Sequence, residues 1–368
     1  MHKRSAFNIP VWILSTVSSV ALAGCQQTQT PAPATPAPAQ TATAPLEAEK
    51  CADCIAVTPL NFVRAESDLY FGNIVKDGGF GKFMHNRTPT PLDKQMIIRM
   101  NRDTLYSAAV FDLDAGPVTI TLPDSGKRFL SMQVINQDQY TPMVVYAKGN
   151  YTLTKDKIGT RYVAVAVRIL ADPNNQQDLD EVHKLQDSIQ VTQKSPGTFE
   201  IPKWDKASQD KVREALTTLA STMHDFANAF GTKQQTDPIM HLIGAAAGWG
   251  GNPDKEAKYI NMNIPNNDGK QLYKLTVKDV PVDGFWSISV YNAKGYFEQN
   301  PYNAYSVNNI TAQKNPDGSV TVQFGGCDGK IANCLPITNG WNAIIRLYRP
   351  RPEILNGKWK FPEAQPVG

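Results

Sequence analysis

The sequence has little net charge and no basic segment beyond its first residues. Its 368 residues include 37 Lys and Arg against 34 Asp and Glu, for a formal net charge of +3. A nucleic-acid-binding surface needs a basic patch or stripe, so we expect no nucleic acid partner. Hydrophobic residues make up 41% of the chain, which excludes wholesale disorder and suffices for about two domains with cores of their own.

Motifs of several enzyme classes are absent as well. The chain contains no Gly-x-Ser-x-Gly elbow, no His-Glu-x-x-His and no dinucleotide-binding glycine fingerprint. We therefore predict no cofactor and no metal site. A Ser/His/Asp triad assembled from distant positions stays open, because the order of triad residues in a sequence is not fixed. Histidine is scarce, and beyond the first residues the chain has His85, His183, His224 and His241.

The longest apolar run lies at the N-terminus. A basic start at residues 1–4 precedes an apolar stretch from Phe7 to Ala21, which is too short to favour a membrane-spanning helix. The following Leu22-Ala23-Gly24-Cys25 resembles the lipobox of bacterial lipoprotein signal peptides. The resemblance implies that residues 1–24 are removed and that a lipidated Cys25 anchors the protein to a membrane. An ordinary secretory signal is the alternative.

The residues after the lipobox extend this interpretation. Gln26 stands where Asp would otherwise follow the lipidated cysteine, which by the same resemblance implies an outer membrane lipoprotein of the bacterial cell envelope, facing the periplasm or the surface. Residues 25–49 are rich in Pro, Ala and Thr. Such a segment cannot bury enough apolar surface to fold, and proline keeps it extended. We predict a disordered tether.

Cysteine is sparse, and the number of cysteines bears on the cellular compartment of the protein. Besides Cys25 the chain has Cys51, Cys54, Cys327 and Cys334. An exported chain meets an oxidising environment, where paired cysteines are the rule. Neighbours in sequence close the smallest loops, so we predict Cys51–Cys54 and Cys327–Cys334 disulfides. A four-cysteine zinc site and a redox role for the first pair are the alternatives.

Helices are predicted at three places. Thr58-Pro59 has the capping hydroxyl and first-turn proline of a helix start, and Gly78 marks the end of that helix. Residues 172–193 are typical of a loop that leads into a helix. Apolar residues at spacings of three and four predict the longest helix over Ala207–Phe230, joining two β units. His224, beside that stripe, is interpreted as a histidine at the edge of a core.

Two sets of short strands flank the long predicted helix. Short strands separated by Gly, Pro, Asn and Asp turn signals favour antiparallel sheets or sandwiches over βαβ units. Prolines at 350, 352 and 362 predict an extended tail after the second set. The predicted strands are Ser107–Asp112, Val118–Leu122, Phe129–Ile135, Met143–Ala147, Tyr162–Leu170, Tyr273–Val277, Phe285–Tyr291, Val320–Phe324 and Ala343–Tyr348.

Several motifs in this order resemble a bacterial family of two-domain exported proteins. The family combines domain of unknown function 1254 with domain of unknown function 1214. The resemblance implies two β-rich domains, the second jelly-roll-like, and no settled activity. The motifs are Asn101-Arg102-Asp103-Thr104-Leu105-Tyr106-Ser107, Asp112-Leu113-Asp114-Ala115-Gly116-Pro117, Asp138-Gln139-Tyr140, Gly284-Phe285-Trp286-Ser287, Tyr291-Asn292, Asn300-Pro301, Tyr305-Ser306, Asp317-Gly318-Ser319, Trp341 and Arg346-Leu347-Tyr348-Arg349-Pro350.

The predicted fold class is α+β and mainly β, with two β-sandwich-like units joined by a helical segment. The predicted organisation is a signal peptide at 1–24, a tether at 25–49, an N-terminal β-rich domain at 50–200, a helical connector at 201–250 and a C-terminal β-sandwich domain at 251–368.

Polar residues ahead of the first strands form the leading candidate site. Asn101, Arg102, Asp103 and Tyr106 could hold a ligand carboxylate or hydroxyl, with Asp103 as a base. The alternative is a salt bridge and turn at the strand entrance, since Asn and Asp favour turns. Asp138 and Tyr140, at a strand end, are further candidates for the same cleft.

The second β unit contributes aromatic and basic candidates. Trp286 could be a stacking platform for a sugar, with packing in the core as the alternative. Arg346 and Arg349 could flank an acidic ligand, or could be ordinary solvated or ion-paired residues.

The leading functional prediction is an envelope protein that binds a small ligand or partner in a cleft between its two β-rich domains. The alternative is an envelope hydrolase that acts on a small ester, glycan or lipid-like substrate with Asp103 and a histidine, and a purely structural surface protein is the third. Convergence of Asp103, Arg102, Asp138 and a histidine in one pocket would favour the hydrolase. A cleft lined by aromatic rings would favour binding.

Overall fold

The computed structural model describes residues 51, 53–95, 99–223 and 225–367. These residues belong to one unit, Glu49–Gly368. The predicted signal peptide, the tether with its Cys25, and His224 lie outside the described residues. The mainly β, α+β fold is confirmed, with strands in several antiparallel sheets.

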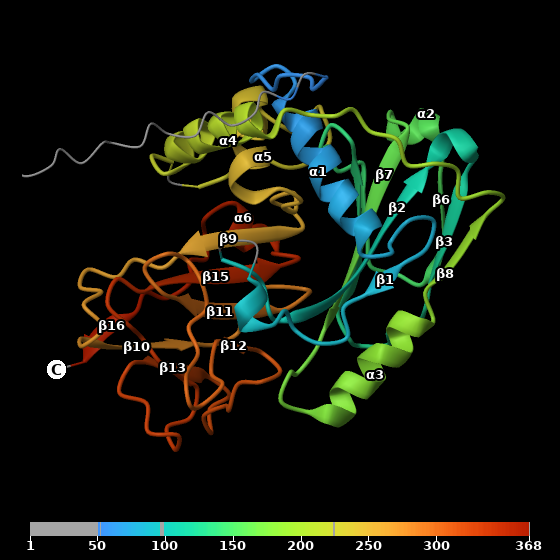
Figure 1. Cartoon of the computed structure of the whole chain (residues 1–368). Helices are drawn as coiled ribbons and strands as arrows, with labels where there is room; N and C mark the ends of the chain where they lie inside the picture. The colour runs from blue at the N-terminus through green and yellow to red at the C-terminus, as the bar shows by residue number, and fades with distance from the viewer. Residues whose placement is uncertain (1–50, 52, 96–98, 224, 368) are drawn as a thin grey trace, which may run out of the picture. The chain divides into compact units, whose positions relative to one another are not determined.

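The first β unit combines a five-stranded and a three-stranded sheet. The longest pair, β2 and β7, runs antiparallel from Thr104 opposite Leu170 to Asp112 opposite Tyr162, and both strands are drawn at the centre of this sheet in Figure 1. The larger sheet has the order β1 (Met84–His85), β2 (Thr104–Asp112), β7 (Tyr162–Leu170), β4 (Leu130–Asn136) and β5 (Met143–Val145), and the smaller has the order β6 (Gly149–Leu153), β3 (Val118–Leu122) and β8 (Gln190–Gln193).

Alternation along the strands places one core between these two sheets. In β3 the buried residues are Val118, Ile120 and Leu122, while the intervening threonines are half-buried. Their apolar side chains meet residues of the larger sheet such as Phe111 and Val165 in one cluster. A strand with period-two alternation buries one face, so the sequence pattern alone specifies which face points inward.

The second β unit consists of two four-stranded sheets in a jelly-roll-like layout. Side chains from both sheets share one core, in which Trp341 and Phe324 stack. One sheet has the order β14 (Cys334–Leu335), β13 (Val320–Phe324), β10 (Leu272–Val277) and β16 (Gln365–Val367); the other has the order β12 (Ser306–Asn308), β11 (Trp286–Tyr291), β15 (Asn342–Tyr348) and β9 (Ala257–Asn261).

Strands β11 and β15 are buried along nearly their whole length on both faces. One face holds apolar residues such as Ile288 and Leu347 and belongs to the sandwich core. The other face holds Ser287, Ser289 and Arg346, which are 0%, 0% and 3% exposed. Buried polar side chains require hydrogen-bond partners. This second face is therefore covered by a partner surface, which the first β unit supplies.

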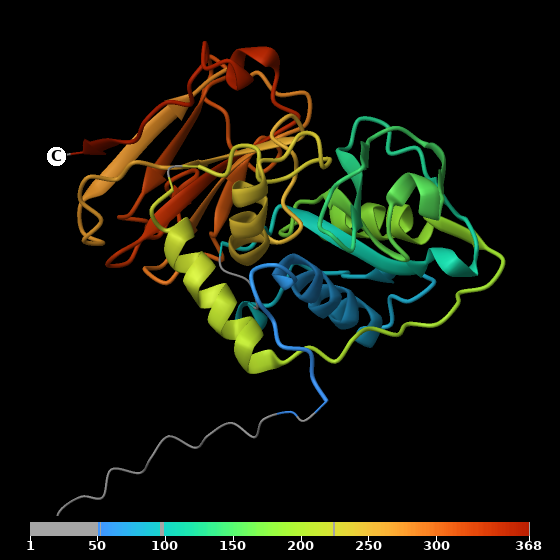
Figure 2. The same ribbon diagram turned by 90° about the horizontal axis from the view of Figure 1, so that it is seen from above.

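The main helices pack together beside the sheets. Helices α1 (Phe62–Lys76), α4 (Lys206–Ala220) and α5 (Pro238–Gly248) contact one another around a small apolar cluster, and Figure 2 shows α4 beside α5. No helix in the described part of the chain has the length and apolar character to cross a bilayer. The remaining helices are η1 (Leu92–Lys94), η2 (Leu113–Ala115), α2 (Lys155–Ile158), α3 (Gln176–Asp187) and α6 (Pro352–Leu355).

The predicted helix over Ala207–Phe230 is longer than the helix that forms there. Helix α4 ends at Ala220 rather than Phe230, and Leu219 of the predicted apolar stripe is 53% exposed. The hydroxyls of Ser221 and Thr222 donate to backbone carbonyls of the last turn, a local competition that favours a helix end. Phe230 then packs against Gly244 of α5 from a non-helical segment, so its apolar spacing reflects tertiary packing.

Other corrections concern the ends of elements. The first helix begins at Phe62, four residues after the predicted capping residue Thr58. Gly149 and Asn150, residue types that favour turns, belong to strand β6. The predicted extended tail contains helix α6, with Pro352 in its first turn, and strand β16, which pairs with β10. Strands this short acquire their hydrogen bonds from partners far away in sequence, so local pattern does not reveal them.

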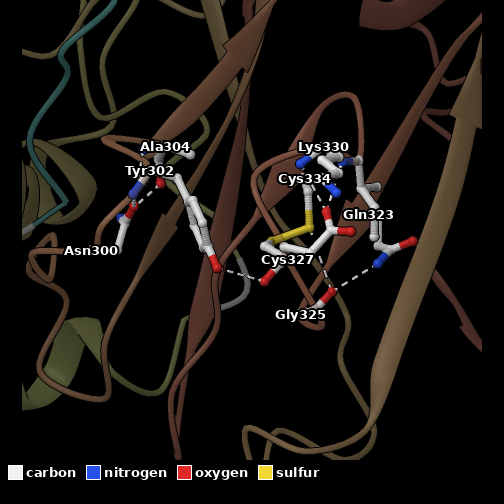
Figure 3. The surroundings of a disulfide bond; sticks show 10 residues. Asn300, Tyr302, Ala304, Gln323, Gly325, Cys327, Lys330 and Cys334 are labelled. Atoms are coloured by element: carbon white, nitrogen blue, oxygen red, sulfur yellow. Dashed lines mark hydrogen bonds between the residues drawn. A yellow bond between two sulfur atoms is a disulfide. The ribbon is translucent and has the colours of Figure 1, made fainter.

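Both predicted disulfides are confirmed. Cys51 bonds to Cys54 and Cys327 to Cys334, which leaves no thiolate for the four-cysteine zinc alternative. Figure 3 shows the second bridge, where the Tyr302 hydroxyl points to the carbonyl oxygen of Cys327 and donates to it over 2.8 Å. The bridge closes the loop between β13 and β14.

Candidate functional site

The chain ahead of β2 lies against the polar face of β11 and β15. The Tyr291 hydroxyl donates to the carbonyl of Met100 over 2.8 Å, and the Arg346 guanidinium donates to the carbonyl of Arg99 over 2.7 Å. The amide of Asn101 donates to the Tyr348 hydroxyl over 3.0 Å. The segment that sequence motifs marked as a strand entrance therefore joins the two β units.

Asp103 inserts into the second β unit. It is 1% exposed, and its Oδ1 accepts hydrogen bonds from the Ser306 hydroxyl (3.1 Å) and the Asn308 amide (3.2 Å). Its own backbone N–H donates to Asn101 Oδ1 over 2.8 Å. Among the described residues, Asp103 Oδ2 has no hydrogen-bond partner. Burial and these contacts give Asp103 a joining role between β2 and β12.

Arg346 supplies the opposite charge to this region. Its guanidinium donates to the Ser289 hydroxyl over 2.9 Å and to the Tyr291 hydroxyl over 2.7 Å. Burial acts to lower the pKa of Arg346, but nearby Tyr291 and Asp103 outweigh it and raise that pKa. Arg346 is therefore charged throughout the physiological range. We call Asn101, Asp103, Ser289, Tyr291, Ser306, Asn308, Arg346 and Tyr348 the junction cluster.

Two other residues of the leading motif have different neighbours. Arg102 donates to the carbonyl of Thr90, and its guanidinium carbon lies 5.3 Å from the ring centroid of Tyr305. Burial lowers the pKa of Arg102 below its usual value. Tyr106 is half-buried and lies beneath Arg168, whose guanidinium carbon is 5.2 Å from its ring centroid. Burial acts to raise the pKa of Tyr106, but the charge of Arg168 and several side-chain hydrogen bonds together outweigh it and lower that pKa.

Arg168 is a buried residue that the sequence motifs did not indicate. It is 7% exposed, lies opposite Tyr106 in the β2–β7 ladder, and donates to Gln133 Oε1 over 2.8 Å. The one signal for it is an arginine inside an otherwise apolar strand, Tyr162–Leu170. A charge in such a strand must find polar partners on the buried face.

The structure does not bring Asp138 and Tyr140 to the junction cluster. Asp138 Oδ1 accepts from the Arg64 guanidinium over 2.5 and 2.9 Å, while the Tyr140 ring stacks on His241 with centroids 4.5 Å apart. His241 is 5% exposed and contacts the carbonyl oxygens of Asp138 and Ala229. These residues join the first β unit to helices α1 and α5. The two carboxylates of the sequence hypothesis therefore have separate partners.

Trp286 belongs to the core rather than to an open platform. It is 6% exposed and packs near Phe361 with ring centroids 6.1 Å apart. It also lines a small cavity of about 190 Å³. That volume lies below the usual range of small-molecule sites, so core packing, the alternative reading of this tryptophan, describes its environment.

A larger cavity of about 550 Å³ lies where the two β units meet. The residues that line it come from segments far apart in the chain, which include the loop ahead of β4 and the residue after β15. Of the candidates named from the sequence, Arg349 lines it, whereas Asp103, Asp138, Trp286, Arg346 and the other candidates do not. The lining comprises Ser125, Gly126, Lys127, Arg128, Phe129, Leu130, Tyr146, Leu170, Asp172, Asn175, Asp178, Asp283, Gly284, Asn309, Ile310 and Arg349. We call it the inter-unit cavity.

Several charges in the inter-unit cavity neutralise one another. Arg128 forms two hydrogen bonds to Asp178, of 2.6 and 3.0 Å, and one of 3.1 Å to Glu181. The bond to Asp178 raises the pKa of Arg128. Asp283 pairs with Arg351 over 2.7 Å. These pairs fix the wall of the cavity and neutralise the charges that take part in them.

Arg349 differs from its neighbours in the cavity wall. Its guanidinium carbon lies 4.5 Å from the ring centroid of Tyr146. Among the described residues, its side chain forms no hydrogen bond or ion pair. Tyr146 is held in turn by its hydroxyl, which donates to Glu256 Oε2 over 2.6 Å. Burial and Glu256 raise the pKa of Tyr146 far above its usual value, so the ring stays neutral.

Aromatic rings form the floor beneath the inter-unit cavity. Phe285 stacks on Tyr348 with centroids 4.3 Å apart, and Phe129 lies edge-on to Phe285 at 5.0 Å. Gly284 lines the cavity above them, and a side chain there would meet the carbonyl of Tyr348 at 2.7 Å. Through Tyr348, which accepts from Asn101, this floor connects to the junction cluster.

The arrangement suits binding better than metal or acid/base chemistry. In the described ranges, no group of three or more His, Cys, Asp and Glu side chains could hold a metal ion. Positive charge, ring faces and backbone groups line the inter-unit cavity, and the buried Asn309 Oδ1 has no described hydrogen-bond partner. Such a wall can orient a ligand through a few polar contacts.

Comparison with known protein families agrees with the motifs. A protein of unknown function (DUF1254) family matches residues 80–193, and a protein of unknown function (DUF1214) family matches residues 262–352. The two matches follow each other in that order and together cover more than half of the chain. This chain is a DUF1254/DUF1214 protein. A search among curated proteins found no match.

Solved structures that are similar to this chain include proteins from two bacteria. The VPA0106 protein from Vibrio parahaemolyticus is 17% identical, with a TM-score of 0.62, over 84% of this chain and 100% of that one. An uncharacterised protein from Burkholderia cenocepacia is 13% identical, with a TM-score of 0.48, over 84% of this chain and 87% of that one. The first likeness shows the fold alone.

Both halves of this DUF1254/DUF1214 protein build the inter-unit cavity. Arg128 and Tyr146 lie in the DUF1254 match, whereas Asn309 and Arg349 lie in the DUF1214 match. The cation–ring pair of Arg349 and Tyr146 crosses from one to the other. The cavity therefore exists only when the two parts are assembled as they are here.

Proposed function

We propose that this DUF1254/DUF1214 protein is a lipid-anchored protein of the bacterial cell envelope that binds a small ligand in the inter-unit cavity. The observation that carries the proposal is the cavity of about 550 Å³ lined by both parts of the chain. This volume lies within the range of about 300–1,000 Å³ that small-molecule sites occupy.

The surroundings of the inter-unit cavity supply the rigidity that a binding site requires. The aromatic floor beside it is largely buried and is connected through Tyr348 to the junction cluster. Its rim consists of loop residues such as Ser125, Asn309 and Ile310. Loops held by a rigid scaffold commonly carry binding residues, and preorganised groups lower the entropy lost on binding.

Filling the inter-unit cavity should abolish ligand capture. Ile310 lines the cavity and is 43% exposed, so Ile310→Trp places a large ring in it at small cost to the fold. The mature full-length protein, purified in detergent, would be incubated with an envelope metabolite extract, and retained compounds would be measured by mass spectrometry. We expect one compound to be retained at about one molecule per chain by the wild type and lost, by at least tenfold, in Ile310→Trp.

Ile331→Trp is the matched control for this experiment. Ile331 is 39% exposed and lies in the Cys327–Cys334 loop, away from the cavity lining. The control should retain the compound as the wild type does. Equal retention by all three proteins, or retention by none, would contradict the proposed function.

The anchor is tested by removing the predicted lipidation residue. We expect Cys25→Ser to move the protein from the membrane fraction to the soluble fraction, because several acyl chains on one residue supply the membrane affinity. The measurement is fractionation of cells followed by immunoblotting, with the Cys327→Ser and Cys334→Ser double variant as a control that keeps the lipobox. Unchanged association of Cys25→Ser with membranes would show that the anchor is elsewhere.

The hydrolase alternative gains no support from the geometry. Asp103 bonds to Ser306 and Asn308, and no described histidine is among its partners. The histidines make other contacts: His85 with the Ser107 hydroxyl, His183 with a backbone carbonyl, and His241 with two backbone carbonyls. Ligand binding is therefore the single function that we propose.

A further inference from the structure

We propose that the ligand of the inter-unit cavity is a small organic acid with an apolar body, and that Arg349 binds its acidic group. This inference rests on the proposed ligand-binding function and adds the chemical class of the ligand. It is argued from the unused hydrogen-bond donors of Arg349, from the balance of unpaired charge around it, and from the apolar residues beside it.

The Arg349 guanidinium is positioned but unpaired. It lies 4.5 Å from the Tyr146 ring centroid and forms no side-chain hydrogen bond with the residues that the structure describes. A guanidinium has five N–H donors in a plane. The contact with the ring uses no hydrogen bond of these donors, and a guanidinium with free donors matches a carboxylate in a two-pronged geometry.

Other contacts keep Arg349 where it is. Its backbone N–H donates to the carbonyl of Glu256 over 2.8 Å, and its carbonyl accepts from Asp283 N–H over 2.9 Å. The Glu256 side chain meanwhile accepts the Tyr146 hydroxyl and lies 3.6 Å from Lys255 Nζ. Glu256 thus fixes both members of the cation–ring pair, and its carboxylate is engaged by groups other than the Arg349 side chain.

The remaining charges of the inter-unit cavity favour an anion. Arg128 is paired with Asp178, and Asp283 is paired with Arg351. In the described ranges, Lys127, Arg349 and Asp172 are the lining residues of full charge without an ion-pair partner. Asp172 Oδ1 accepts from the backbone N–H of Asn174. The lining therefore has two cations without an ion-pair partner, Lys127 and Arg349, and one such carboxylate, Asp172, which already accepts a hydrogen bond within a turn.

An apolar part of the ligand has a place beside this charge. Phe129, Leu130, Leu170 and Ile310 line the same cavity. Removing apolar surface from water stabilises a complex in proportion to the area that is buried. A ligand with a ring-sized apolar part can pack on these residues while its acidic group binds Arg349.

The test uses three probes of one shape and different charge. Benzoate, benzamide and benzylamine would be titrated into the mature full-length protein and followed by saturation-transfer NMR and calorimetry. We expect benzoate to bind at least tenfold more tightly than benzamide, and benzylamine to bind most weakly. Arg349→Gln should weaken benzoate binding at least tenfold, while Arg349→Lys, which keeps the charge but loses the planar fork, should have intermediate affinity.

Arg64→Gln is the matched control, because Arg64 is a partly exposed arginine outside the cavity lining. It should bind benzoate as the wild type does, and all variants should keep the thermal unfolding midpoint of a folded protein. Equal affinity for the three probes, unchanged benzoate affinity in Arg349→Gln, or no benzoate binding at all would overturn the inference. The proposed function is judged separately, by whether Ile310→Trp loses the compound retained from the envelope extract.

Discussion

We expect Arg346→Met to lower the free energy of unfolding by about 3–5 kcal/mol, the cost that follows when one partner of a buried charged network is removed. Arg346 is 3% exposed, and its guanidinium donates to two side-chain hydroxyls, of Ser289 and Tyr291, and to two backbone carbonyls, of Arg99 and Met100. Methionine has similar length and fills the space, so the loss measures hydrogen bonds rather than a cavity. Urea unfolding followed by fluorescence and circular dichroism would give the value.

Two further variants make the Arg346 result specific. Arg349→Met, three residues along, removes an arginine whose side chain forms no hydrogen bond among the described residues, and it should change stability by about 0.5 kcal/mol or less. In the Arg346→Met background, Asp103→Asn should recover about 1 kcal/mol, since it removes the charge left without its counterpart. If Arg346→Met and Arg349→Met cost the same, the junction cluster does not stabilise the protein.

Phe285→Ala should cost about 3–5 kcal/mol, the usual effect of removing a fully buried phenylalanine. Phe285 is 0% exposed and lies between two rings, stacked on Tyr348 at 4.3 Å and edge-on to Phe129 at 5.0 Å. Phe129 belongs to the first β unit and Tyr348 to the second, so the loss falls on the joint between them. Denaturant unfolding measures the cost, and hydrogen exchange of β7 and β15 amides locates it.

Phe285→Leu is the control for this second prediction. Leucine keeps most of the buried volume, so it should cost about 1–2 kcal/mol and leave amide exchange in β7 and β15 close to that of the wild type. An effect of Phe285→Ala below about 1 kcal/mol, or one confined to the second β unit, would show that the aromatic floor does not hold the two units together.

The strands that sequence alone predicted well are those with strong local patterns. Val118–Leu122 and Tyr162–Leu170 occur with the predicted bounds, because alternation or a long β-branched run specifies burial without reference to a partner. Strands β1, β14 and β16 have two or three residues each. Segments this short show no periodicity of their own, and β16 pairs with β10, far away in sequence, so no local pattern reveals them.

The sequence motifs singled out residues that meet in the structure, but the partners of those residues were not visible in the motifs. Asn101 and Asp103 stood out ahead of a strand and Arg346 within the last predicted strand, and the structure brings them together in the junction cluster. The alternative reading of Asn101-Arg102-Asp103, a structural element at a strand entrance, is closer to what is observed. Its partners in the second β unit are 203 to 247 residues away, so no rule based on spacing along the chain could have identified them.

By itself, the sequence determined the mainly β fold, the family, the short-loop disulfides and the strands with clear periodicity, because each depends on contacts among near neighbours or on motifs in order. Only the tertiary structure decided that Arg349 stacks on Tyr146, more than 200 positions earlier, and that both line one cavity. That pairing arises when two separately patterned sheets meet on faces that are polar and buried. Which polar groups become buried depends on how the whole chain folds, so it cannot be predicted from residues that are neighbours in the sequence.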